Sequence, residues 1–150
     1  MSQRNLRLLL GGCLGLLLLL SGCGGGGSTT SLTRGEFIKK GNAICEKQRD
    51  KRNKKIEEGV ALVPEGQVMS SKLKKKVMLE ITPFYEKMTQ ELKELEAPEK
   101  DRKRIEKIVK SMEDATQETR AHLARAINRS VEYTEPNELN REYGLEACTI

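Results

Sequence analysis

The thiols are the most reactive side chains in this sequence, and Cys23 stands in the most distinctive context. A thiolate is a strong nucleophile that accepts covalent modification. Cys23 ends the run Leu20-Ser21-Gly22-Cys23, in which two small residues precede the sulfur.

The segment before Cys23 has the organisation of an export signal. Arg4 and Arg7 form a short positive region, and residues 8–20 are an uncharged, leucine-rich block. As a helix, this block would reach about 20 Å, which is short of the roughly 30 Å hydrocarbon core of a bilayer. We therefore expect residues 1–22 to be a signal peptide that is removed, together with Cys13.

The run Leu20-Ser21-Gly22-Cys23 after such a leader resembles the lipobox of bacterial lipoproteins. The resemblance implies that the Cys23 sulfur takes a diacylglycerol, with fatty acids such as palmitate, and that Cys23 becomes the first mature residue. Two acyl chains anchor a protein stably, whereas one gives only marginal binding. The implied location is the extracytoplasmic face of the cell membrane. The alternative is an ordinary secretory signal with an unrelated cysteine.

Two more cysteines, Cys45 and Cys148, remain once Cys23 is lipidated. In an oxidising compartment this arithmetic predicts one disulfide between them. It would close a loop of about 100 residues, for which chain-entropy theory gives roughly 4.7 kcal/mol of stabilisation. Free thiols and an intermolecular bridge are the alternatives.

The composition of the mature chain predicts one domain that does not bind nucleic acid. Residues 23–150 keep 25 of the 27 basic residues and all 22 acidic ones, a net charge of +3. The chain has no tryptophan and only five Phe and Tyr residues, so base stacking has little support. Residues 23–32 are a Gly/Ser/Thr-rich, flexible tether, and residues 33–150 are the folded domain.

The first helix has a clear start. Thr33 and Glu36 fit a capping box, and Leu32 and Phe37 occupy the positions of a hydrophobic staple. The pattern extends to about Gly59 or Leu62, with Ile56, Val60 and Leu62 resuming the apolar face. No apolar residue occurs over residues 46–55, so this stretch either projects beyond its neighbours or meets a polar partner.

Three further patterns that predict helices follow, two long and one short. Apolar residues recur at steps of three and four over 73–95, which predicts a helix that Pro83 kinks or splits. Pro98 suits the first position of a third helix, whose rhythm continues to Ile127. Pro136 precedes a short last helix with Gly144 after its end.

The expected fold is therefore all-α. It is a three-helix antiparallel bundle, with the second helix kinked at Pro83, plus a short C-terminal helix stapled by one disulfide. The runs 37–45, 92–98 and 143–148, together with Pro83, are similar to small secreted helical lipoproteins of actinobacteria. That resemblance implies a paired first and last cysteine in a helical domain, and it implies no activity.

No motif for catalysis, cofactor binding or metal binding stands out. His122 is the only histidine, and a metal site would need further nitrogen or sulfur ligands, so we expect a partly buried or boundary side chain. Glu91 and Glu94 lie one helical turn apart, where solvated charge is the default. We therefore expect no enzyme, no catalytic residue, no cofactor and no metal.

A basic stretch in the first helix is the sharpest candidate for contact with an anionic surface. Such a surface could be anionic lipid or a wall polymer. Solvated helix faces balanced by neighbouring acidic residues are the simpler interpretation. The basic stretch in the first helix consists of Lys47, Arg49, Lys51, Arg52, Lys54 and Lys55. Two further basic clusters cover residues 72–76 and 100–104.

The leading hypothesis is a membrane-anchored lipoprotein with a non-enzymatic binding or structural role in the cell envelope. The alternative is a helical carrier or sensor module that holds a small apolar ligand between helices. A wall-associated enzyme is a third possibility. The sequence identifies no protein partner.

Overall fold

The computed structural model describes residues 31–127 and 133–150, and every regular element in these two ranges is helical. The all-α class is thus confirmed for this part of the chain. The expected signal peptide, Cys23 and most of the tether lie outside the described residues. The elements are α1 (Arg34–Val60), α2 (Ser71–Glu94), η1 (Glu99–Asp101), α3 (Arg102–Ala121), α4 (Leu123–Ala126), α5 (Thr134–Tyr143) and η3 (Glu146–Cys148).

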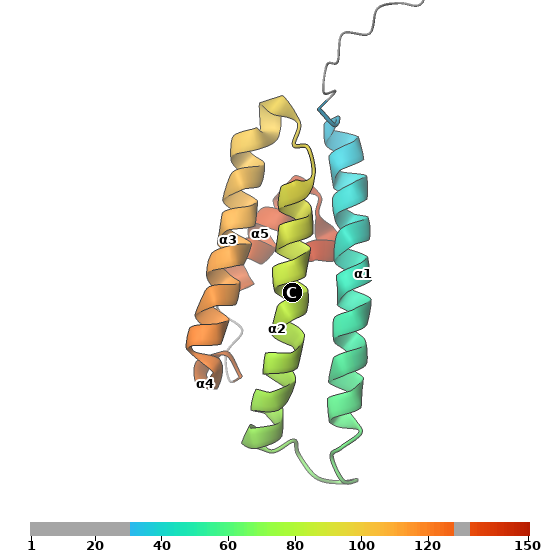
Figure 1. Cartoon of the computed structure of the whole chain (residues 1–150), viewed down its shortest axis with the longest axis vertical. Coiled ribbons are helices and arrows are strands. Elements are labelled where there is room, and N and C mark those ends of the chain that lie inside the picture. Colours follow the sequence, from blue (N-terminus) through green and yellow to red (C-terminus); the bar gives the residue numbers. More distant parts are fainter. Residues whose placement is uncertain (1–30, 128–132) are drawn as a thin grey trace, which may run out of the picture.

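The three long helices lie side by side, and each runs opposite to the one before it (Figure 1). α2 is central and packs against both α1 and α3. The C-terminal segment, α5 with η3, lies behind α2, where η3 packs on α1 and α5 packs on α3. The core is therefore closed by four segments, because the C-terminal segment fills the side between α1 and α3.

The start of α1 follows from local sequence chemistry. The Glu36 N–H donates to Thr33 Oγ1 at 3.3 Å, and the Thr33 N–H donates to the Glu36 carboxylate at 2.9 Å. These bonds satisfy backbone donors that the first helical turn leaves without partners. Phe37 is fully buried, and Leu32 packs against the same core. The predicted capping box is confirmed.

Pro83 lies inside α2 without dividing it. The helix is continuous from Ser71 to Glu94, so of the two expected outcomes, a kink or a split, the split is excluded. A proline removes the hydrogen bond to the carbonyl four residues earlier, here Leu79. Both Pro83 and Leu79 are exposed, so water can reach that carbonyl. The lost bond is therefore tolerated on the outer face of the helix.

The third predicted helix differs from the structure at both ends. Pro98 has ψ of 131° and precedes η1, so it is not the first residue of α3. At the other end, His122 leaves the helical region with φ −129° and ψ 48°, and α4 follows as a separate short helix. No glycine or proline marks this break. The apolar rhythm to Ile127 therefore gave no sign of it.

The end of α5 is shaped by Gly144, as predicted. Gly144 adopts φ of +100°, a left-handed conformation that costs glycine little. The Leu145 N–H then donates to the Asn140 carbonyl at 2.8 Å, and Leu145 turns into the core with 1% exposure. The helix begins at Thr134, so Pro136 lies within its first turn instead of preceding it.

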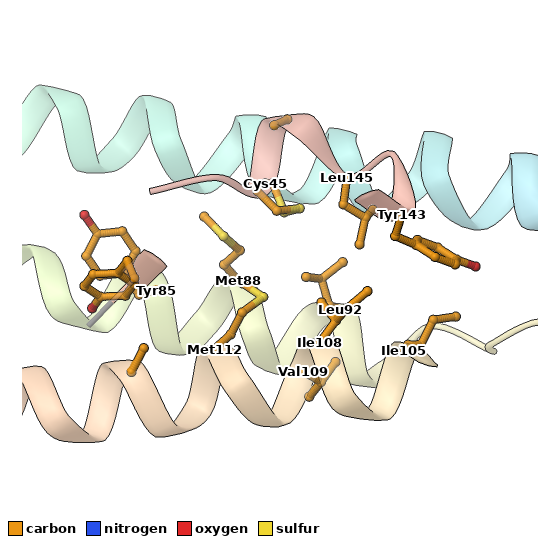
Figure 2. Close-up of a cluster of buried hydrophobic side chains, with 14 of the residues drawn as sticks. Cys45, Tyr85, Met88, Leu92, Ile105, Ile108, Val109, Met112, Tyr143 and Leu145 are labelled. Atoms are coloured by element: carbon orange, nitrogen blue, oxygen red, sulfur yellow. A yellow bond between two sulfur atoms is a disulfide. The ribbon is translucent and has the colours of Figure 1, made fainter. Parts of the chain in front are cut away.

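The core lies between α2, α3 and the faces of α1 and the C-terminal segment (Figure 2). Cys45 of α1 and Cys148 of η3 form a disulfide with their Cα atoms 4.9 Å apart, which confirms the predicted pair. The bond fastens η3, and not α5 itself, to α1. Asn42 adds to this junction, since its Nδ2 donates to the Gly144 carbonyl and its Oδ1 accepts from the Ala147 N–H, both at 2.9 Å.

Candidate functional site

The predicted basic stretch on α1 does not form one surface. Lys47, Lys51 and Lys54 are exposed, and their spacing of four and three residues places them on one helical face. The other three, Arg49, Arg52 and Lys55, are half-buried. The structure thus divides the six cations into an exposed lysine row and three half-buried side chains, of which Arg52 contacts α2.

The missing apolar pattern in this stretch is explained by polar contacts with α2. Gln48 is fully buried, and its Nε2 donates to Glu91 Oε1 at 3.1 Å. The Arg52 guanidinium carbon lies 5.6 Å from the centroid of the Tyr85 ring, and Arg52 Nη1 donates to Tyr85 Oη at 3.4 Å. Burial raises the pKa of Tyr85 above its ordinary value. This part of α1 therefore meets a polar partner within the domain.

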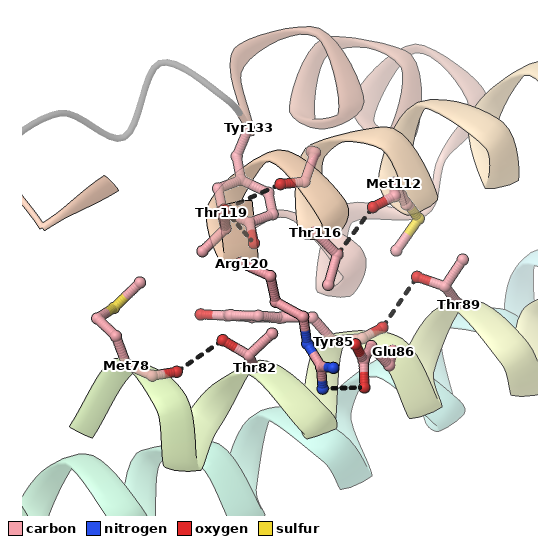
Figure 3. A network of polar contacts seen from close by, with 11 residues as sticks. Met78, Thr82, Tyr85, Glu86, Thr89, Met112, Thr116, Thr119, Arg120 and Tyr133 are labelled. Atoms are coloured by element: carbon pink, nitrogen blue, oxygen red, sulfur yellow. Dashed lines mark hydrogen bonds and ion pairs between the residues drawn. The ribbon is translucent and has the colours of Figure 1, made fainter. Parts of the chain in front are cut away.

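A row of threonine hydroxyls occupies the interface of α2 and α3 (Figure 3). Each donates to the carbonyl four residues earlier on its own helix, as when Thr82 Oγ1 donates to Met78 O at 2.6 Å. Because helix carbonyls already hold these hydroxyls, they are poorly placed to act as nucleophiles. Thr119 Oγ1 also lies 3.1 Å from Tyr133 Oη. The other threonine hydroxyls that donate to a backbone carbonyl four residues earlier are those of Thr89 (to Tyr85), Thr116 (to Met112) and Thr119 (to Ala115).

A tyrosine flanked by two arginines lies at the end of the domain where α1 begins. Tyr143 is 1% exposed, and its hydroxyl donates to Asp101 Oδ2 at 2.9 Å. The guanidinium carbons of Arg34 and Arg104 lie 4.8 and 5.5 Å from its ring centroid. Burial, followed by the hydrogen bond to Asp101, raises the pKa of Tyr143 to about 12. This tyrosine is a neutral structural anchor at physiological pH.

An apolar groove runs between the end of α2 and the start of α3. It has a volume of about 470 Å³ and is open to solvent. Its floor is apolar, whereas charged side chains such as Lys93 and Glu113 stand at its rim. The floor is formed by Leu92, Leu95, Ala97, Ile105 and Val109.

The connection between α1 and α2 carries exposed apolar side chains. Val60 and Leu62 are 53% and 64% exposed, so the expectation that they resume the apolar face of α1 is wrong. Gly59, which lies against Val77 of α2, is the last buried residue of the helix, and Leu62 lines a solvent-open pocket with Leu73. The apolar residues Leu62, Val63 and Val68 on either side of Pro64-Glu65-Gly66 were the signal in the sequence for this exposed connection.

His122 also lies elsewhere than predicted. Its side chain is 54% exposed, since the break after α3 turns it outward, and its Nε2 is 3.7 Å from Glu118 Oε1. Among residues 31–127 and 133–150, no three His, Cys, Asp or Glu side chains gather as a metal site would require. Within the same ranges, no helix has both the length and the hydropathy to cross a bilayer.

No protein-family model, curated protein or solved structure matches this chain. Function must therefore be argued from the chain itself. Four features could contribute to function: the sequence around Cys23, the exposed lysine row of α1, the apolar groove, and the exposed connection between α1 and α2.

Proposed function

We propose that this protein is a lipid-anchored lipoprotein on the extracytoplasmic face of the cell membrane, with a non-enzymatic binding or structural role in the envelope. The observation that carries the proposal is Leu20-Ser21-Gly22-Cys23 at the end of an uncharged apolar block. A diacylglycerol on Cys23 would hold the chain at the bilayer through two acyl chains. The capped start of α1 at Thr33 follows only ten residues later.

The domain suits a role as a helical body that the segment before Thr33 would join to the anchor. Its architecture is best described as a three-helix antiparallel bundle in which α5 and η3 close the third side. The disulfide between Cys45 and Cys148 is compatible with an oxidising compartment. In this proposal the tether sets the distance from the membrane, and the surface of the domain does the binding.

Metabolic labelling with a palmitate analogue tests the anchor. The wild-type chain should carry label and partition into detergent, whereas Cys23→Ala should lose both properties. Cys13→Ala is the matched control, because it removes a thiol from the leader and should keep the label. Labelling that persists in Cys23→Ala, or that is absent from the wild type, would contradict the proposal.

The apolar groove favours a second candidate function, that of a carrier for a small apolar ligand. Its volume of about 470 Å³ lies within the range of small-molecule sites. An environment-sensitive apolar dye should bind the wild-type domain and lose affinity in Leu95→Asp, which places charge in the groove. Leu79→Asp, on the exposed face of α2, is the matched control. Equal dye binding by both variants would refute this function.

A further inference from the structure

The end of the domain farthest from Thr33 has an exposed apolar tip, which we define as residues 60–70. Leu62 is 64% exposed and Val68 is 90% exposed. A tight turn presents them, in which the Gln67 N–H donates to the Pro64 carbonyl at 3.0 Å and Gly66 has φ of +75°. The large hydrophobic side chains found exposed in the described ranges all lie in this half of the domain: Val60, Leu62, Val68 and Leu79.

Basic side chains surround the tip. The segment 51–76 contains eight basic and three acidic residues. The opposite end, formed by segments 34–46 and 94–106, contains seven of each. The excess positive charge is therefore concentrated at the same end as the exposed apolar residues. We call the exposed lysines beside the tip the lysine collar, and they are Lys54, Lys72, Lys74 and Lys75.

We propose that the tip docks into an anionic lipid surface, with Leu62 and Val68 entering the boundary between headgroups and acyl chains and the lysine collar lying among the headgroups. Interfacial binding of this kind depends on buried apolar area together with attraction to anionic lipid. An anionic wall polymer could also engage the lysines, but it would leave the two apolar side chains in water. The combination of both features favours lipid.

The position of the tip defines what such docking would achieve. α1 has 27 residues, and at about 1.5 Å per residue the tip lies about 40 Å from the start of the helix. Under the proposed function, the acyl anchor and the tip would contact lipid from opposite ends of one stiff domain. This inference extends the proposed function, but binding at the tip itself does not require lipidation of Cys23.

Vesicle sedimentation tests the tip independently of the anchor. The chain 23–150 carrying Cys23→Ser should sediment with vesicles of phosphatidylcholine and phosphatidylglycerol, and much less with phosphatidylcholine alone. Added salt should release it, since screening weakens contacts between exposed charges. Leu62→Ser/Val68→Ser and Lys72→Gln/Lys74→Gln/Lys75→Gln should each lower the affinity by on the order of tenfold. Lys100→Gln/Arg102→Gln/Lys103→Gln, at the opposite end, is the matched control and should bind as the wild type does.

A fluorescent reporter measures insertion directly. The chain has no tryptophan, so Val68→Trp introduces a single indole whose emission should shift to the blue on vesicles that contain phosphatidylglycerol. Lys103→Trp should show no shift. Binding that tolerates Leu62→Ser/Val68→Ser but not the lysine changes would show attraction to anionic headgroups without insertion, and would overturn docking into lipid. Equal sedimentation with both vesicle types, or with neither, would also overturn it and would leave the labelling test of Cys23 unaffected.

Discussion

Gly41 on α1 and Leu145, just beyond α5, are so close that a β-carbon on residue 41 would lie 2.6 Å from Leu145 Cδ2. The same β-carbon would lie 3.1 Å from Leu92 Cδ2 on α2. Leu92 and Leu145 are each 1% exposed, so either side chain could move aside only within the closed core. The absence of a side chain at Gly41 therefore sets the spacing of α1, α2 and the C-terminal segment.

Gly41→Ala is predicted to destabilise the domain by about 1–3 kcal/mol. Overpacking of a closed core costs this much, which exceeds the roughly 1 kcal/mol that alanine gains over glycine within a helix. Gly35→Ala is the matched control, because nothing lies within 4 Å of its added β-carbon. Urea unfolding should show a lower midpoint for Gly41→Ala and an equal or higher one for Gly35→Ala. The reverse order would show that Leu145 can move aside.

The parts of the fold that depend on neighbours in sequence could be predicted. The capping box at Thr33 and the left-handed Gly144 involve contacts within a few residues, so residue types and spacing were sufficient. The break at His122 has no glycine or proline to mark it, and the closure of the core by the C-terminal segment depends on contacts between distant segments. Local patterns contain no information on those contacts.

The same distinction applies to the candidate sites. The sequence showed six cations in nine residues, but it could not separate exposed Lys51 from half-buried Arg52, because that difference depends on where α2 lies. The exposed tip was missed for a related reason. Val60 and Leu62 fit the apolar rhythm of α1, and only the end of the α1–α2 contact leaves them in solvent. Pairing of Cys45 with Cys148 was accessible, since it followed from counting thiols.

Loss of the disulfide is predicted to cost about 2–5 kcal/mol, because the bond restricts a loop with a sequence separation of 103 residues in the unfolded chain. Reduction, or the double change Cys45→Ala/Cys148→Ala, should lower the urea midpoint while the far-ultraviolet circular dichroism of the folded state stays helical. Mass spectrometry of unreduced peptides should show the linked pair. A reductant that leaves the midpoint unchanged would contradict the prediction.

Tyr143 is predicted to make stability depend on pH in the alkaline range. Burial and the hydrogen bond to Asp101 raise its pKa to about 12 in the folded state, whereas the ordinary tyrosine value is 10.0. Because the folded state holds this proton more tightly, the contribution is complete below pH 10 and is lost as the pH rises to about 12. Burial also raises the pKa of Tyr85, so tyrosinate absorbance of Tyr143→Phe should lose one late-titrating group, the one near pH 12, and keep another. A native titration complete near pH 10 would contradict this assignment.

Arg52 and Lys51 are adjacent cations, but only Arg52 is predicted to contribute to stability. Arg52 lies over the Tyr85 ring and donates to its hydroxyl, whereas Lys51 is exposed on the outer face of α1. Arg52→Ala should therefore lower the free energy of unfolding by about 0.5–1 kcal/mol, the usual range for a cation over an aromatic ring at a partly exposed site. Lys51→Ala removes the same charge and should change it little.

A double-mutant cycle with Tyr85→Leu separates the ring contact from the general loss of packing around Arg52. In the Tyr85→Leu background, Arg52→Ala should cost clearly less than it does in the wild type, because its aromatic partner is already absent. Lys51→Ala should cost the same in both backgrounds. Equal costs for Arg52→Ala in the two backgrounds would mean that the arginine stabilises α1 through its aliphatic stem, and that the polar segment of the helix is held by Gln48 and Glu91 instead.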